Sequence, residues 1–144
     1  MKFFNTAGPV DPVDHYLLNP LERLDLEDLM FLIAQKKYFS LHAPRQTGKT
    51  SLLMALMHKI NLEGNYHCLY VNIETAQTAR EDVGEGMQSI VTQLAVHADH
   101  FLNDHFFKEN RDEIELNSGP HSLLVNILSA WARSVPKPIV LLID

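Results

Sequence analysis

The sequence predicts an α/β fold in which a mostly parallel β-sheet lies between two layers of helices, a three-layer αβα arrangement. Three stretches carry this prediction. The first is an apolar run at 38–42, YFSLH, which leads through a short loop into a helical pattern. The second is 67–74, HCLYVNIE, typical of another strand. The third, 139–143, IVLLI, is an unbroken apolar run of the kind found in parallel strands buried on both faces.

Composition predicts one soluble globular unit, because 46% of the 144 residues are hydrophobic and 21% are charged. The net charge of −6 gives no electrostatic footprint for nucleic acid or for an anionic membrane surface, although local basic patches stay open. The N-terminus lacks a signal-peptide pattern, and no stretch approaches ~20 apolar residues. A cytoplasmic location is therefore expected. Cys68, the single cysteine, has no disulfide partner in the chain and is expected to be a buried, inert thiol.

The chain is expected to begin with an extended arm at 1–24, which contains three turn-forming pairs, Gly8-Pro9, Asp11-Pro12 and Asn19-Pro20. The main domain, 25–144, then opens with a helix over 25–37. Asp25 is a good N-cap for this helix. Its apolar face is predicted to contain Leu26, Leu29, Met30 and Ile33.

Three more helical patterns follow along the domain. Residues 49–61 repeat apolar side chains at Leu53, Leu56, Met57 and Ile60, and Gly64 is a natural stop. Thr78 and Glu81 form a capping box that predicts a helix running to about Ala98. The acidic stretch 106–117 is interpreted as a surface connection. A last helix, with Ser118 as N-cap, is predicted to bury Leu123, Leu124, Ile127, Leu128 and Trp131.

The loop between the first strand and the second helix carries the chemistry. Its sequence, 43–50, is APRQTGKT, which differs from the strict phosphate-binding pattern, Gly, four residues, Gly-Lys-Ser/Thr, only in having Ala43 at the first glycine. In such a loop the backbone amides and the helix N-terminus present partial positive charge to phosphates. Lys49 would reach the β- and γ-phosphates, and the Thr50 hydroxyl would ligate Mg²⁺.

An acidic residue, Asp144, follows the buried run 139–143. Open α/β sheets place ligand chemistry at the carboxyl ends of their strands. With the phosphate loop upstream, this arrangement predicts a Walker B strand whose Asp144 holds the Mg²⁺ that bridges the phosphates. The predicted metal ligands are therefore Thr50 and Asp144.

The loop APRQTGKTSLL, the preceding HYLLNPLERLDLEDLMFLIAQKKYFSLH, the strand CLYVNIE and the closing PKPIVLLID resemble bacterial AAA-like P-loop ATPases, in the branch near the STAND and archaeal-type ATPases. The resemblance covers nearly the whole chain. It implies a P-loop NTPase sheet that binds ATP and Mg²⁺, with hydrolysis in the complete domain. The nucleotide-contacting residues would be Ala43, Pro44, Arg45, Gln46, Thr47, Gly48, Lys49, Thr50 and Ser51.

Tyr16 is a further candidate, because in similar ATPases the segment before the first strand runs past the adenine. Its ring would stack on the base. The alternative is that Tyr16 packs against the first helix.

The resemblance also predicts what this sequence lacks. In that family the Walker B aspartate is followed by a catalytic glutamate, a sensor strand and a lid or effector domain. The sequence stops at Asp144, so the sheet is expected to be incomplete at the C-terminus, with a slot of ~10 Å between strands 38–42 and 139–144. The expected partners are the nucleotide, a missing downstream segment or effector domain, and further copies of the chain in a homo-oligomer. The chain alone is expected to turn over no ATP and to be poorly stable.

Two other functions compete with an ATPase module. A non-hydrolysing nucleotide sensor or assembly scaffold of STAND type would hold nucleotide to lock one state. A small-molecule kinase would also use a phosphate loop, but it would need additional arginines at an acceptor site, of which the stretch after 61 offers few.

Overall fold

The structure is a computed structural model that describes residues 1–4, 11, 13–16, 19–45 and 47–144. The chain divides into two compact units, Met1–Lys59 and Ile60–Asp144. The phosphate-loop sequence belongs to the first unit, and Asp144 belongs to the second. Each unit is described below by itself.

The fold differs from the predicted one, because the described residues are mostly helical. Their sheet has two strands, β1 (His67–Val71) and β2 (Ile139–Ile143), which pair in parallel with His67 opposite Ile139 and Val71 opposite Ile143. The predicted three-layer αβα P-loop NTPase sheet is therefore wrong. Both predicted strands in the second unit do form, and their parallel pairing places the ends of β1 and β2 at the same edge.

The stretch 38–42 does not form the strand that its apolar pattern predicted. A strand exists only where its backbone N–H and C=O groups pair with a neighbour. The only strand paired with β2 in the described residues is β1. The expected slot between two strands, 38–42 and 139–144, consequently has no counterpart.

In the first unit, two short helical segments precede the loop. The 3₁₀-helix η1 (Pro20–Arg23) is capped by Asn19, whose Oδ1 accepts from the Leu21 amide at 3.1 Å. After one extended residue, Leu24, helix α1 (Leu26–Ala34) begins. The Asp25 carboxylate accepts from the Asp28 amide at 3.1 Å, which confirms the predicted N-cap.

Helix α2 (Lys49–Glu63) follows the loop and runs from the first unit into the second. All four side chains of its predicted apolar face are buried: Leu53, Leu56, Met57 and Ile60. The predicted stop is also confirmed, because Gly64 follows the helix closely with a φ of +79°. This left-handed conformation costs glycine little and strains other residues.

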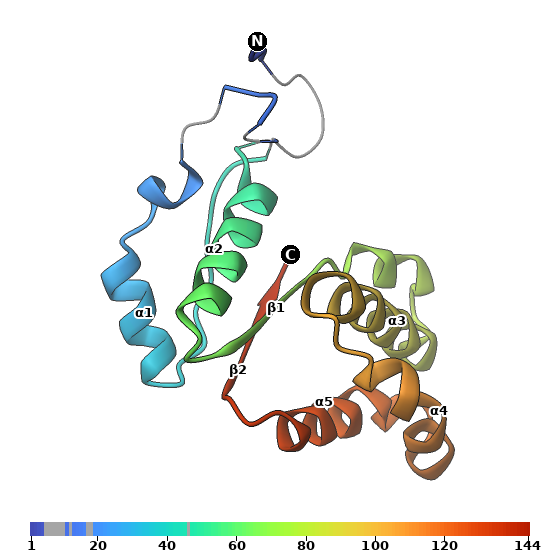
Figure 1. Cartoon of the computed structure of the whole chain (residues 1–144). Coiled ribbons are helices and arrows are strands. Elements are labelled where there is room, and N and C mark those ends of the chain that lie inside the picture. Colours follow the sequence, from blue (N-terminus) through green and yellow to red (C-terminus); the bar gives the residue numbers. More distant parts are fainter. Residues whose placement is uncertain (5–10, 12, 17–18, 46) are drawn as a thin grey trace. The chain divides into compact units, whose positions relative to one another are not determined.

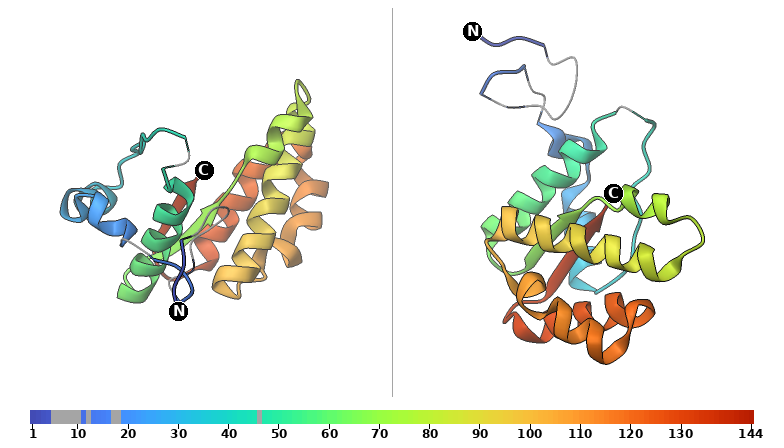
Figure 2. Two further views of the ribbon diagram at one scale, coloured as in Figure 1. Left: turned by 90° about the horizontal axis from the view of Figure 1, so that it is seen from above. Right: turned by 90° about the vertical axis from the view of Figure 1, so that its right-hand side faces the viewer.

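The second unit contains helices α3 (Val83–Leu102), α4 (Phe106–Ser118) and α5 (Leu123–Ser134). The three helices pack against one another, and α3 also packs on β1, on one side of the strand pair (Figures 1 and 2). Two 3₁₀-helices, η2 (Glu74–Ala79) and η3 (Pro120–Ser122), precede α3 and α5. Their common core contains Leu69, Val71, Val91, Leu94, Ala95, Ala98, Phe107, Leu123, Ile127 and Trp131.

Three of the predicted helix assignments in this unit were wrong. Ser118 does not cap the last helix, because it is the last residue of α4, and η3 and α5 both begin after it. Thr78 lies in η2, and α3 instead begins after Asp82, whose carboxylate accepts from the Glu85 amide at 2.9 Å. The stretch predicted to be a surface connection is α4, which buries Phe107 completely. Its polar composition hid a narrow apolar stripe, because a helix lying on a core needs only one buried face.

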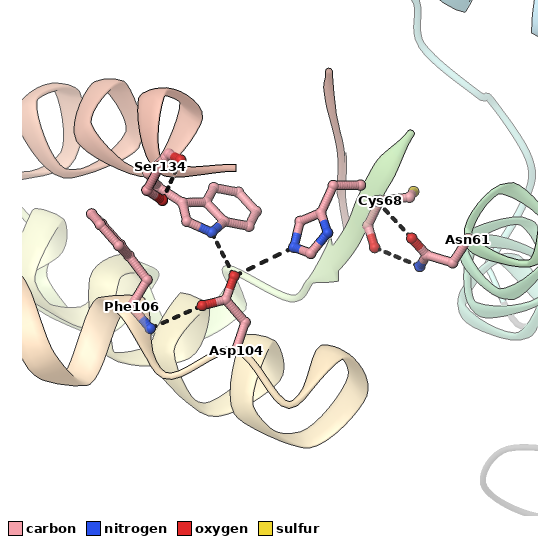
Figure 3. Close-up of polar contacts among 7 residues, drawn as sticks. Asn61, Cys68, Asp104, Phe106 and Ser134 are labelled. Atoms are coloured by element: carbon pink, nitrogen blue, oxygen red, sulfur yellow. Dashed lines mark hydrogen bonds and ion pairs between the residues drawn. The ribbon is translucent and has the colours of Figure 1, made fainter. Parts of the chain in front are cut away.

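The edge of β1 that faces away from β2 is closed by side chains. Successive residues of a strand direct their backbone groups to alternate sides, and His67 and Val71 bond toward β2. The backbone N–H and C=O groups of Cys68 therefore face away from β2. There the Asn61 side chain donates to the Cys68 carbonyl at 2.8 Å and accepts from the Cys68 amide at 2.9 Å (Figure 3). His97 contacts the Tyr70 carbonyl through Nδ1 at 3.0 Å. Asn61 thus takes the place of a neighbouring strand.

Replacing Asn61 with Ala is expected to lower the free energy of unfolding by about 1–2 kcal/mol, because two hydrogen bonds to the backbone of the fully buried Cys68 are lost. Urea unfolding followed by circular dichroism measures the change. Leu62→Ala is the matched control, since Leu62 is the next residue of the same helix and is exposed. Equal losses in both variants would show that shortening a side chain of this helix, and not loss of the hydrogen bonds to β1, lowers the free energy of unfolding.

Burial of Cys68 agrees with the predicted inert thiol. The side chain is fully buried, and that burial raises the pKa of the thiol to about 12. At neutral pH the thiolate, which is the reactive form, is scarcely populated. Among the described residues, no helix combines the length and apolar character needed to cross a bilayer.

Candidate functional site

The predicted phosphate loop ends at the N-terminus of α2. The Gly48 carbonyl accepts from the Leu52 amide at 3.0 Å, so Gly48 immediately precedes the first turn and Lys49 is its first residue. Gly48 has a φ of +80°. The first amides of an α-helix point out of its N-terminus, toward any anion bound there. Lys49, Thr50 and Ser51 therefore occupy the turn on which phosphate binding was predicted.

Two hydrogen bonds hold the loop, and both are accepted by its backbone carbonyl groups. Thr47 Oγ1 donates to the Pro44 carbonyl at 2.7 Å, which closes the loop across three residues. Arg23 Nη1 donates to the Thr47 carbonyl. Ala43 is half-buried, Pro44 and Arg45 are exposed, and Gln46 lies outside the described residues. Sequence reasoning missed Arg23, which lies 24 residues before Thr47 and carries no motif of its own.

Tyr16, the candidate for base stacking, lies in the N-terminal arm. Its amide donates to the Phe3 carbonyl at 3.1 Å, and its ring lies 5.0 Å from that of Phe4. The side chain is more than half exposed. Both the stacking role and the alternative packing on α1 stay predictions.

In the second unit, Asp144 follows β2 and is fixed at the carboxyl ends of both strands. The Asp144 amide donates to the Val71 carbonyl at 2.9 Å, and the Asp144 carbonyl accepts from the Ile73 amide at 3.1 Å. The Tyr70 hydroxyl donates to the carboxylate at 3.1 Å. Tyr70 itself is nearly buried. The position of Asp144 at a strand end is the one predicted for a magnesium ligand.

The predicted metal ligands, Thr50 and Asp144, belong to different units. A hydroxyl and a carboxylate are oxygen donors of the type that Mg²⁺ prefers, and Mg²⁺ commonly keeps waters and phosphate oxygens as its other ligands. The chemistry of this pair therefore fits the predicted ion. Within the described ranges, no three residues of His, Cys, Asp or Glu lie close enough to form a protein-only metal site.

A separate hollow of about 350 Å³ lies in the second unit, at the start of β1 and the α3–α4 turn. Asp104 is the polar centre beside it (Figure 3). One of its oxygens accepts from Trp131 Nε1 at 2.8 Å and lies 3.3 Å from His67 Nε2, and the other accepts from the Phe106 amide at 2.9 Å. Because both carboxylate oxygens are engaged, Asp104 acts as a structural hub that joins β1, α4 and α5.

The mouth of this hollow also carries an ion pair. His105, at the hollow, contacts Asp99 at 2.8 Å, and Lys108 bonds the other oxygen of the same carboxylate. The hydrogen bond from Lys108 lowers the pKa of Asp99, although burial opposes the shift. Exposed pairs of this type contribute little to stability.

Residues 29–144 match the family model described as nephrocystin 3, N-terminal. The matched region includes α2, its preceding loop and Asp144, and it covers more than half of the chain. No curated protein and no solved structure shows a significant match.

Proposed function

This chain belongs to the nephrocystin 3 N-terminal family, and we propose that residues 43–51 within that family region bind the phosphates of MgATP. The observation that carries the proposal is the conformation at Gly48. The Gly-Lys-Thr sequence coincides with a glycine at a φ of +80° and with the first turn of a 15-residue helix. That coincidence supplies outward amides and a lysine at one point.

In this proposal each residue has a separate task. The amides of the first turn of α2 hold phosphate oxygens, and Lys49 adds a full positive charge. Thr50 and Asp144 would supply oxygen ligands to a magnesium ion, which would add positive charge at the phosphates. The resemblance to AAA-like ATPases supports ATP over other nucleotides. It also supports hydrolysis where a water-activating glutamate is provided, since phosphoryl transfer depends on positioning and charge stabilisation.

The proposal is tested by calorimetric titration of the purified chain with ATP, in excess Mg²⁺ and in EDTA. Wild-type protein is expected to bind ATP more tightly with Mg²⁺. Asp144→Asn keeps the shape and the acceptor for the Tyr70 hydroxyl but removes the charge. MgATP should then bind roughly five- to tenfold more weakly, a loss of about 1–1.4 kcal/mol.

Metal-free ATP provides the opposite control. Because Asp144→Asn removes a negative charge, binding of ATP in EDTA should be unchanged or tighter. Absence of ATP binding by wild-type protein at millimolar nucleotide would refute the proposed function. An equal loss with and without Mg²⁺ would refute the role of Asp144 as a metal ligand.

A further inference from the structure

Arg23 contacts the phosphate loop beside Gly48, a residue type whose backbone is less restricted than that of other residues. Its Nη1 donates to the Thr47 carbonyl and lies 3.6 Å from the place where a Cβ on Gly48 would be. Both contacts fall on the peptide unit that joins Thr47 to Gly48. The loop therefore receives a charged donor from a segment that the nucleotide motif does not include.

The backbone around Arg23 is itself held from both sides. Arg23 is the last residue of η1, which is capped by Asn19, and Asp25 caps α1 two residues later. The Leu24 amide also donates to the Leu21 carbonyl at 3.1 Å. The guanidinium thus extends from a segment whose backbone is held by a cap on each side.

The geometry of a peptide unit gives this contact a consequence. In a trans peptide the C=O and N–H groups lie in one plane and point in opposite directions. The bond from Thr47 to Gly48 is trans. When Arg23 holds the Thr47 carbonyl on one side, the Gly48 amide is directed to the other side. The orientation of one loop amide is therefore set by Arg23.

Gly48 makes this restraint necessary. Glycine adopts positive and negative φ with similar ease, so the peptide before it can rotate at small cost. A rotated peptide would present the Thr47 carbonyl oxygen, with its partial negative charge, where a phosphate is expected. Such a conformer does not bind an anion, and its population lowers the apparent affinity in proportion.

We propose that Arg23 is a positioning residue for the nucleotide: it locks the Thr47–Gly48 peptide so that the Gly48 amide faces the phosphates. This inference rests on the proposed function of the loop. Arg23 acts through the loop backbone and need not touch the nucleotide.

The test compares Arg23→Ala with wild type by calorimetry with MgATP and by ¹⁵N-resolved NMR with MgATP. Affinity is expected to fall about tenfold, as when only about one loop in ten is competent to bind. Without nucleotide, the Gly48 amide resonance of the variant should differ from that of wild type, and saturating MgATP should bring the two together, because only the competent conformer binds. The Lys49 and Thr50 amides should still shift in both. Arg133→Ala, an exposed change on α5, is the control for loss of one positive charge.

Measuring the MgATP affinities at low and high salt distinguishes a positioning role of Arg23 from a direct charge contact with the triphosphate. A direct charge contact between Arg23 and the triphosphate would weaken as salt screens it. Loss of a backbone restraint would give the same fold-change at low and high salt. A fold-change that disappears at high salt, or a Gly48 amide resonance that is the same in nucleotide-free wild type and Arg23→Ala, would overturn this inference while leaving nucleotide binding intact. Failure of wild-type protein to bind MgATP would instead overturn the proposed function.

Discussion

Replacing Trp131 with Ala is expected to lower the free energy of unfolding of the second unit by about 3–5 kcal/mol, the range for removal of a buried large aromatic side chain. Trp131 is completely buried, and its ring centroid lies 4.9 Å from that of Phe107 and 5.6 Å from that of His67. Truncation leaves a cavity between α4, α5 and β1. It also removes the donor that bonds Asp104 at 2.8 Å.

Trp131→Phe separates these two causes. It keeps most of the aromatic volume and removes the N–H group, so the expected loss is about 1.5–3 kcal/mol, the contribution of a hydrogen bond to a charged group. Urea unfolding is followed by far-ultraviolet circular dichroism, since Trp131 is the single tryptophan and its fluorescence is lost in both variants. A loss below about 1 kcal/mol for Trp131→Ala would show that this core is not a cooperative part of the unit.

Replacing Lys49 with Ala is expected to weaken MgATP binding roughly 10- to 100-fold. Hydrogen bonds that involve a charged group contribute about 1.5–3 kcal/mol, and each ~1.4 kcal/mol changes the dissociation constant tenfold. Lys49 is the first residue of α2, and in the proposed site its ammonium and the helix amides would act on the same anion. Calorimetry with MgATP measures the change directly.

Two variants control for charge and for folding. Lys49→Arg keeps the positive charge but changes its shape, so its affinity should lie between those of wild type and Lys49→Ala. Lys137→Ala removes an exposed lysine outside the loop and should bind MgATP as wild type does. Equal affinity of Lys49→Ala and wild type, with both proteins folded, would exclude residues 43–51 as the nucleotide site.

Local interactions explain the features that were correctly predicted from the sequence. The Asp25 cap, the stop at Gly64 and the buried faces of α2 and α5 each depend on residues within a few positions of one another. An unbroken apolar run likewise predicted β2 correctly, because a strand buried on both faces leaves no room for polar side chains.

The start of α3 and the presence of α4 were predicted wrongly because the local sequence was ambiguous at both places. Thr78 and Asp82 are both good N-caps, and only the packing of α3 on β1 determines that Asp82 begins the helix. The acidic stretch that became α4 gains its stability from burying Phe107 on a core built by other segments. Its own composition is too polar to predict that burial.

The sequence by itself determined the loop motif, most helices and the two strands that form. Only tertiary structure decided that 38–42 is not a strand, that Asn61 closes the edge of β1, and that Asp104 joins β1 to α4 and α5. It also brought Arg23 to the Thr47 carbonyl. The physical reason is shared by all four: a hydrogen bond between distant residues depends on where the chain folds each partner, and neither partner carries a local pattern that specifies the other.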